Sequence, residues 1–198
     1  MSLGRKKSNP HRIAILGILT AIILIQNFVP FLGNIPIPPL NPTIIHITVI
    51  VATLVLGTKD GMIIGGVWGL TRMLRAYTVP ATPLDLWLWT NPLIALLPRI
   101  LIGLFTGITF NLMKKYFPNK SKLSMSIASI AGAFTNTIFV LLFIYLFYGE
   151  RYAEATSVDF SSLANVLLVI VGTSGIAEAI LAGIAAPLVA APLKKLRH

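Results

Sequence analysis

The strongest constraint on this chain is the length of its predominantly apolar runs, in which charged residues are rare. One run extends over residues 13–28, and others extend over about residues 43–56, 123–148 and 162–193. Of the 198 residues, 56% are hydrophobic and only 11% are charged, and the mean hydropathy is +0.84. A soluble domain carries roughly 25% charged residues. Helices that are apolar on every side are typical of bilayer proteins, so the sequence predicts an integral membrane protein rather than a globular enzyme or a disordered chain.

The number of spans follows from the length of the chain. A spanning helix needs about 20 residues, which leaves room for five or six spans once loops are allowed. We predict a single all-α membrane domain over residues 1–198 with six transmembrane helices. Proline-rich or irregular segments at about residues 30–42 and 78–91 separate some of them. The predicted spans are about residues 11–29, 43–56, 61–77, 92–115, 123–148 and 162–193.

The distribution of charge indicates an orientation. With six spans and a cytoplasmic N-terminus, twelve of the sixteen lysines and arginines fall in cytoplasmic segments. Four of the six acidic residues then fall in outer loops. This bias follows the positive-inside rule and predicts that both termini are cytoplasmic. The net charge of +10 is thereby explained by topology and by contacts with anionic lipid, and no nucleic-acid partner is expected.

Three arginines interrupt the outer halves of the predicted spans. Arg72 and Arg75 lie one helical turn apart, and Arg99 lies roughly 10 Å below the outer end of its span. An ionisable side chain inside a bilayer is costly, so each is a candidate for function. Asp85 and Glu178 are the only acids expected nearby. The excess of positive charge favours an anion, and a guanidinium pairs with a carboxylate in fork geometry.

Structural roles for these polar residues remain open at this point. Arg75 can extend to the outer interface, and Arg99 can form a salt bridge with Glu178. Asn136 can bind a ligand, or it can join two helices through a hydrogen bond. The sequence therefore identifies a polar region in the outer half without separating ligand contacts from helix contacts.

Motifs of known catalytic sites are missing or incomplete. The chain has no cysteine, which excludes disulfides and cysteine-based metal sites, and it has no P-loop sequence for ATP. Residues 172–175 match the G-x-S-G of rhomboid proteases, but the only later histidine is His198 at the C-terminal tail. A serine nucleophile needs a general base within hydrogen-bond reach. We therefore predict that the chain is not an enzyme and binds no cofactor or metal itself.

The chain resembles the S components, which are the substrate-binding membrane subunits of energy-coupling factor (ECF) vitamin transporters. The resemblance covers nearly the whole chain: its size, six spans, basic ends and proline-rich first loop. Four local stretches, residues 35–47, 55–61, 66–72 and 97–103, carry it most closely. They resemble the branch that includes carriers of pantothenate, hydroxymethylpyrimidine and pyridoxine.

This resemblance implies a multi-pass protein of the bacterial cell membrane that binds a vitamin outside with high affinity. The S component then reorients in the membrane and delivers the vitamin inward. The implied partners are a transmembrane coupling subunit and two ABC ATPases, and the partner ATPases use the ATP. The first loop, at about residues 30–42, would gate the site with its prolines, among them Pro36, Pro38 and Pro39.

A small-residue face on the first span is the implied docking site for the coupling subunit. The family uses an A-x-x-x-A motif, and this chain has Gly17 and Ala21 at the corresponding place. Ala14 extends the same face. Because glycine keeps the face small, docking is still expected.

The arginines favour one ligand among the three vitamins of this branch. Pantothenate carries a carboxylate, whereas pyridoxine and hydroxymethylpyrimidine are uncharged near neutral pH. We predict that Arg99 and Arg72 hold the carboxylate, that Asn136 makes a polar contact and that Trp68 forms an apolar wall. The alternatives are one of the neutral vitamins with structural arginines, and a membrane scaffold without a small-molecule ligand. The remaining candidate substrate-binding residues are Arg75, His46 and Asn41.

Overall fold

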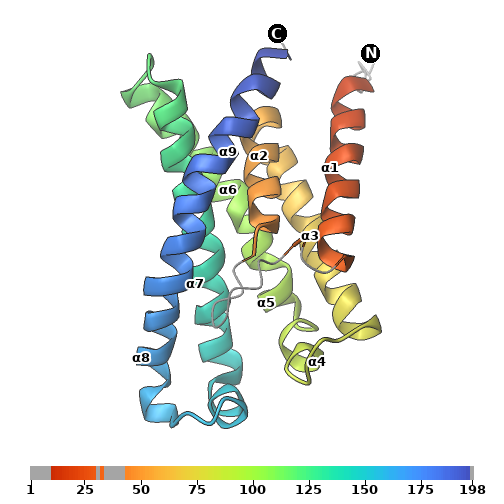
Figure 1. The fold of residues 1–198 in the computed structure, drawn as a ribbon, viewed down its shortest axis with the longest axis vertical. Helices are drawn as coiled ribbons and strands as arrows, with labels where there is room; N and C mark the ends of the chain where they lie inside the picture. Colours follow the sequence, from red (N-terminus) through yellow and green to blue (C-terminus); the bar gives the residue numbers. More distant parts are fainter. Residues whose placement is uncertain (1–9, 30–31, 34–42, 197–198) are drawn as a thin grey trace, which may run out of the picture.

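The computed structural model describes residues 10–29, 32–33 and 43–196. Over these residues the chain is helical and contains no β-strand, which confirms the all-α prediction. The helices form an elongated bundle in which the first helix begins and the last helix ends at the same end (Figure 1). Asn41 and the predicted gating residues of the first loop, Pro36, Pro38 and Pro39, lie outside the described residues.

The helices follow the apolar runs of the sequence closely. Two one-turn helices, α4 and α5, occupy part of the segment between α3 and α6, and a π-turn at Val171–Gly175 joins α8 to α9. The bounds are α1 Pro10–Phe28, α2 Ile45–Leu56, α3 Thr58–Thr78, α4 Asp85–Leu88, α5 Pro92–Ala95, α6 Leu97–Tyr116, α7 Ser121–Ala155, α8 Phe160–Ile170 and α9 Ile176–Leu196.

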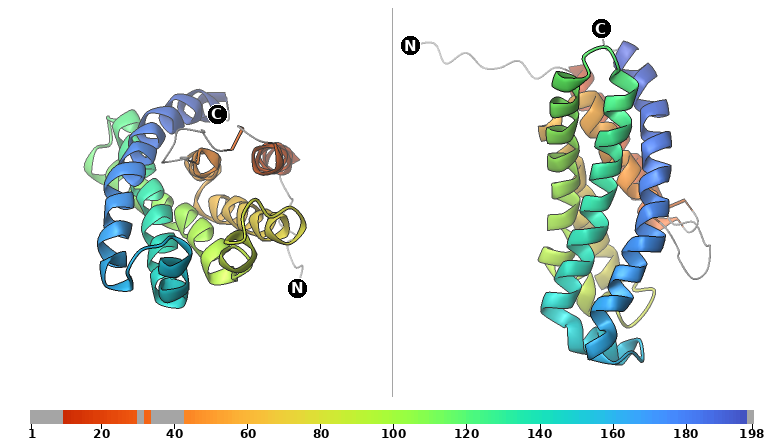
Figure 2. Two further views of the ribbon diagram at one scale, coloured as in Figure 1. Left: turned by 60° about the horizontal axis from the view of Figure 1, so that its bottom comes forward. Right: turned by 90° about the vertical axis from the view of Figure 1, so that its left-hand side faces the viewer.

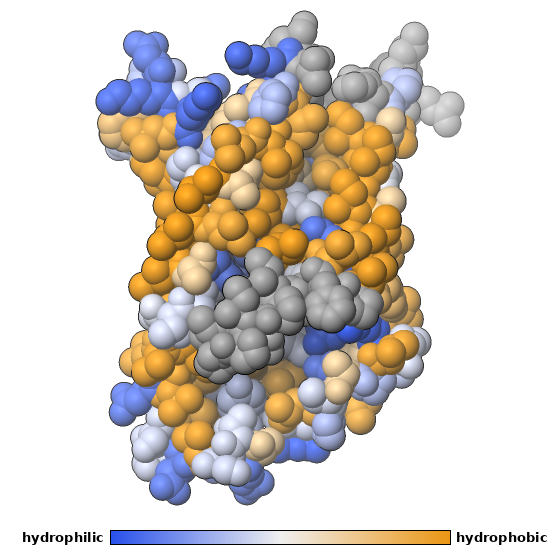
Figure 3. Space-filling model, in the orientation of Figure 1, coloured by the Kyte–Doolittle hydropathy of each residue, from blue (hydrophilic) through white to orange (hydrophobic). Residues whose placement is uncertain are grey.

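Helical stretches of very different length make up the bundle. Among the described residues, three are long and apolar enough to cross a membrane: Pro92–Tyr116, Ser121–Ala155 and Phe160–Lys195. Two apolar helices are shorter, Arg12–Phe28 and Ile45–Leu56. Figure 3 shows a broad apolar band on one face, with hydrophilic residues gathered at the end where α9 ends.

The short helix α2 is apolar on all sides because it is enclosed by the others. Ten of its twelve residues are buried, among them Val49 and Ile50, which are fully inaccessible. Two views along and across the bundle place α2 among α1, α3 and α9 (Figure 2). Such a helix is a core element, and its apolar surface packs against protein rather than lipid.

The prolines of the last helix do not interrupt it, and the irregular turns of α7 and α9 lie elsewhere. Pro187 and Pro192 both lie inside α9, which continues through them to Leu196. Neighbouring helices and local adjustments make proline tolerable in such bundles. The irregular turn is instead the π-turn before α9, and α7 has one non-helical residue at Tyr148 before it continues to Ala155.

Glycines bring α3 and α6 into close contact. A Cβ atom at Gly65 would overlap the backbone carbonyl of Arg99, and one at Gly69 would lie 2.7 Å from the Cα of Leu96. Only glycine permits this approach. Since Arg72 lies one turn beyond Gly69, the contact places the arginines of α3 and α6 on the same side of the bundle.

Candidate functional site

A cavity of about 600 Å³ lies in the half of the bundle opposite the chain ends. The helices α1, α2, α3, α6, α7, α8 and α9 contribute to it, together with the π-turn and the segment between α3 and α5. It contains both arginines and acids, as well as three aromatic side chains. The lining residues are Asn27, Thr43, Ile45, Trp68, Arg72, Arg75, Ala81, Thr82, Asp85, Trp89, Arg99, Asn136, Thr137, Val140, Leu141, Tyr152, Ile170, Ser174 and Glu178.

Arg99 is held in this cavity mainly by aromatic rings. Its side chain is buried, with 4% of the residue exposed, and its guanidinium carbon lies 4.9 Å from the Trp68 ring centroid and 4.8 Å from that of Trp89. Its Nη1 donates to the backbone oxygen of Ile94 at 2.6 Å, and its Nε has no hydrogen-bond partner among the described residues. A guanidinium between indole rings is fixed in orientation and still has donors to offer a ligand.

The guanidinium of Arg72 contacts the same Trp89 ring as that of Arg99, but it also pairs with an acid. Its guanidinium carbon lies 4.8 Å from the Trp89 centroid, and its Nη2 donates to Asp85 Oδ1 at 3.0 Å. Asp85 Oδ2 in turn accepts the N–H of Ala81 at 2.9 Å. The buried Nη1 of Arg72 has no partner among the described residues. Asp85 is therefore an internal counter-ion that neutralises one arginine and leaves part of its donor set unused.

The third arginine, Arg75, serves the scaffold at least in part. Its Nη1 donates to the backbone oxygen of Asn27 at 2.5 Å, and the Asn27 side chain donates to the backbone oxygen of Thr71 at 2.9 Å. These contacts tie the end of α1 to α3. Arg75 also lines the cavity, so its predicted contact with the substrate stays a prediction.

The acid on the opposite wall, Glu178, does not form a salt bridge with Arg99. Over the described residues, the ion pairs within 4 Å are Arg12–Asp60 and Arg72–Asp85. Glu178 instead accepts the backbone N–H of Thr43 at 2.8 Å and the hydroxyl of Thr137 at 3.4 Å. Among the described residues, Arg99 therefore has no salt bridge with Glu178 or with another acid.

Several buried polar atoms around the cavity have no hydrogen-bond partner among the described residues. Besides Arg72 Nη1 and Arg99 Nε, these include Trp68 Nε1 and Asn136 Oδ1. Buried polar groups in folded proteins are nearly always paired. Four unpaired atoms on the walls of one cavity indicate a place where a polar ligand completes the hydrogen bonding.

Most of the substrate-binding residues predicted from the sequence come together here. Arg72, Arg75, Arg99, Trp68 and Asn136 all line the cavity. The exceptions are His46, which is fully buried in α2 but not part of the lining, and Asn41, which lies outside the described residues. On α1 the predicted docking residues are exposed, and among the described residues no other helix comes within 4 Å of where a Cβ at Gly17 would stand. Those docking residues are Ala14, Gly17 and Ala21.

Trp89 and Tyr152 line the cavity but are not among the substrate-binding residues predicted from the sequence. Trp89 follows the one-turn helix α4, in a segment without helical periodicity, so its direction depends on how that segment folds back. Tyr152 lies beyond the irregular residue of α7, in a region expected to be a loop. One signal in the sequence could have indicated Trp89: it lies between Arg72 and Arg99 along the chain, and guanidinium groups often stack on indole rings.

Comparisons with known proteins now identify the family. A family model described as "ECF transporter, substrate-specific component" matches residues 11–190. The chain belongs to this family. As a substrate-specific component, it is 32% identical over 207 residues to the pantothenic acid transporter PanT of Lactococcus lactis subsp. cremoris, with 98% of each chain covered. It is also 35% identical over 168 residues to the pantothenate transporter PanT of Leuconostoc mesenteroides, covering 81% of this chain and 80% of that protein.

Proposed function

We propose that this substrate-specific component binds pantothenate in the 600 Å³ cavity and delivers it across the bacterial cell membrane. The observation that carries the proposal is Arg99, a buried guanidinium on the cavity wall that has no acidic partner among the described residues. A carboxylate supplies the missing charge. The names of both relatives point to the same vitamin.

The groups of pantothenate find complementary partners along the cavity. Its carboxylate pairs with Arg99 and with the unused donor of Arg72, in a site of low dielectric where charge pairing is strong. Its amide and hydroxyl groups hydrogen-bond with Asn136 and Glu178. The Trp68 ring packs against the apolar part of the vitamin. All five residues line the cavity, and four of them, all except Glu178, have a buried atom without another partner among the described residues.

The membrane arrangement is proposed from the sequence and the family. Six spans place both termini in the cytoplasm and the cavity in the outer half, where the vitamin enters. Residues 30–42 form the gating loop. The exposed face of Ala14, Gly17 and Ala21 docks a transmembrane coupling subunit, which joins two ABC ATPases that hydrolyse ATP. The chain itself is no enzyme and needs no cofactor of its own.

A neutral vitamin is the second candidate, and two contacts favour it. Arg72 already has a carboxylate partner in Asp85, and Arg99 donates to a backbone carbonyl at 2.6 Å. If these contacts suffice, the arginines only support the fold, and pyridoxine or hydroxymethylpyrimidine fills the cavity. The buried nitrogen atoms of both arginines that have no hydrogen-bond partner among the described residues favour pantothenate.

A calorimetric titration of the purified chain in detergent decides between them. Pantothenate, pyridoxine and hydroxymethylpyrimidine are each titrated, together with pantothenol, in which an alcohol replaces the carboxylate. We expect tight binding of pantothenate and a loss of at least about 100-fold for pantothenol, because the buried guanidinium then stays unpaired. Tighter binding of a neutral vitamin would overturn the proposal.

A further inference from the structure

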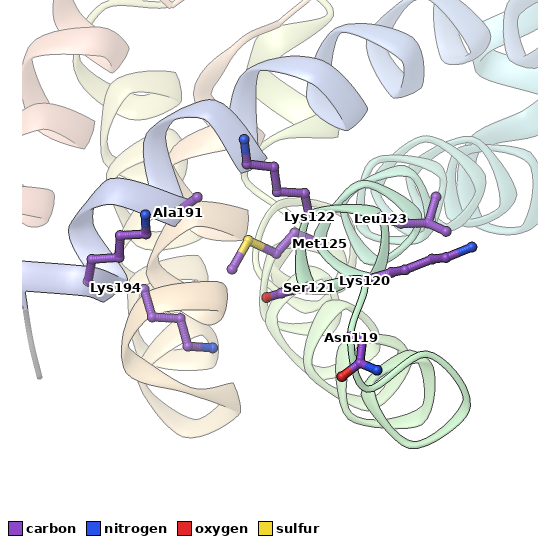
Figure 4. A pocket seen from close by; sticks show the side chains of 9 residues that line it. Asn119, Lys120, Ser121, Lys122, Leu123, Met125, Ala191 and Lys194 are labelled. Atoms are coloured by element: carbon purple, nitrogen blue, oxygen red, sulfur yellow. The ribbon is translucent and has the colours of Figure 1, made fainter.

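A second hollow, of about 590 Å³, lies at the end of the bundle where α9 ends. It is formed by the start of α7, the end of α9 and the turn between α6 and α7. Figure 4 shows Lys122 of α7 and Lys194 of α9 flanking the buried side chain of Met125, while Lys120 extends away from α9. Lys195 also lines the hollow, so lysines from two helices surround an apolar floor.

An apolar groove of about 460 Å³ continues from this hollow along the bundle. The two share Lys122, Ala191 and Lys195. Beyond these residues the groove is lined mainly by α9, where Ile184 is 60% and Leu188 is 69% exposed. The combined surface is therefore charged at its outer end and apolar along its length.

The close approach of α7 and α9 closes the groove at its inner end. A Cβ atom at Gly183 would lie 2.9 Å from Cγ1 of Ile130, so the helices are in contact there. Toward the lysines the two helices separate, as Figure 1 shows. The groove thus has a blind apolar end in the bundle and an open basic end at its edge.

Charge complementarity specifies what fits this surface. Among the described residues that line the hollow and the groove there is no acid. Asp60, which lies at the same end of the bundle, pairs with Arg12. Basic pockets between membrane helices attract phosphate-bearing headgroups, and an apolar groove beside them accommodates an acyl chain.

We propose that this surface is a binding site for an anionic phospholipid, with its phosphate at Lys122 and Lys195 and one acyl chain along Ile184 and Leu188. The site is separate from the vitamin cavity, because the two share no lining residue. It gives the lysine-rich end of the bundle a fixed lipid contact in addition to general attraction to a charged membrane surface.

Native mass spectrometry of the full chain in detergent tests the site. The protein is titrated with phosphatidylglycerol and, separately, with phosphatidylcholine of the same acyl chains. We expect the anionic lipid to bind at least about tenfold more tightly. Each lysine near an anionic lipid contributes roughly a factor of five, so Lys122→Gln with Lys195→Gln weakens binding by about 25-fold.

A matched double variant separates a defined site from bulk charge. Lys59→Gln with Lys115→Gln removes the same charge from exposed positions at the same end, and neither residue lines the hollow or the groove. We expect this variant to bind phosphatidylglycerol within about twofold of the unmodified chain. Equal losses in both double variants would overturn the proposal, as would equal binding of the two lipids.

Two further measurements identify the source of the anion and the role of the groove. Inorganic phosphate and glycerol phosphate are added as competitors, and millimolar displacement of the lipid by either would show an anion site without an acyl-chain component. Ala191→Phe fills the junction of hollow and groove, and we expect it to weaken lipid binding with the lysines intact. Unchanged thermal unfolding and unchanged vitamin binding serve as folding controls, so a failure here is distinguishable from a failure of the proposed vitamin function.

Discussion

The two ends of the bundle contain cavities of almost equal volume, about 600 and 590 Å³, yet they are built from different basic residues. The cavity away from the chain ends uses arginines that are buried against tryptophan rings. The hollow at the other end uses lysines that remain largely exposed. Guanidinium is planar, stacks on aromatic rings and tolerates burial, whereas ammonium is compact and strongly hydrated. The comparison teaches that the type of cation, more than the number of charges, separates the buried cavity from the exposed hollow.

The largest effect is expected from Arg99. We predict that Arg99→Ala weakens pantothenate binding by about 100-fold or more, since breaking a buried charge pair costs about 2–5 kcal/mol. Arg99→Lys recovers only part of the loss, because an ammonium cannot reproduce the contacts with Trp68 and Trp89. Calorimetric titration in detergent measures both.

Arg151 provides the matched control for this test. Its guanidinium carbon lies 4.7 Å from the Trp87 centroid at the same end of the bundle, but it does not line the vitamin cavity. Arg151→Ala is expected to leave pantothenate affinity within about twofold. If Arg99→Lys bound pantothenate as tightly as the unmodified chain, the positive charge alone would explain the site. The contrast between buried arginines at one end and exposed lysines at the other would then be wrong.

The second prediction concerns the unpaired amide oxygen of Asn136. We expect Asn136→Ala to weaken binding by about tenfold, the effect of losing one buried hydrogen bond worth roughly 1–1.5 kcal/mol. Thr135→Ala is the control, because the Thr135 hydroxyl donates to Ala131 of its own helix and does not line the cavity. If Asn136→Ala and Thr135→Ala bound pantothenate with the same affinity, Asn136 would contribute to helix packing and not to ligand binding.

The sequence predicted the helices better than it predicted the site, for a physical reason. Apolar runs report burial in bilayer or core directly, so the helix bounds lie within a few residues of the apolar runs, except that α7 continues to Ala155. The arginines were identified because a charge in an apolar run is costly wherever it lies. Trp89 was not assigned, since its place depends on the fold of an irregular segment. The exclusion of His46 from the lining depends on the direction in which α2 faces, which no pattern in a uniformly apolar helix specifies.

The third prediction sharpens the role of the internal counter-ion. Asp85 competes with a ligand carboxylate for Arg72. We expect Asp85→Asn to tighten pantothenate binding by about fivefold, since removing a negative charge near the ligand contributes on the order of 1 kcal/mol in a partly shielded site. Glu154→Gln removes an exposed acid at the same end and is expected to have no effect. Weaker binding by Asp85→Asn would mean that Asp85 mainly holds Arg72 in position.

The smallest effect is expected when arginines replace two lysines of the hollow. Lys122→Arg with Lys195→Arg keeps the charge of the hollow and changes only its shape. A hydrated headgroup at an exposed site is held by charge at short range. Over the described residues, the lysine–ring contacts are those of Lys114 and Lys194 with Phe110, so neither Lys122 nor Lys195 has such a contact there to lose. We therefore predict phosphatidylglycerol binding within about twofold of the unmodified chain, measured by native mass spectrometry. A loss as large as that of the double glutamine variant would show that the hollow discriminates ammonium from guanidinium, and lysine would then be as specific at its end of the bundle as arginine is at the other.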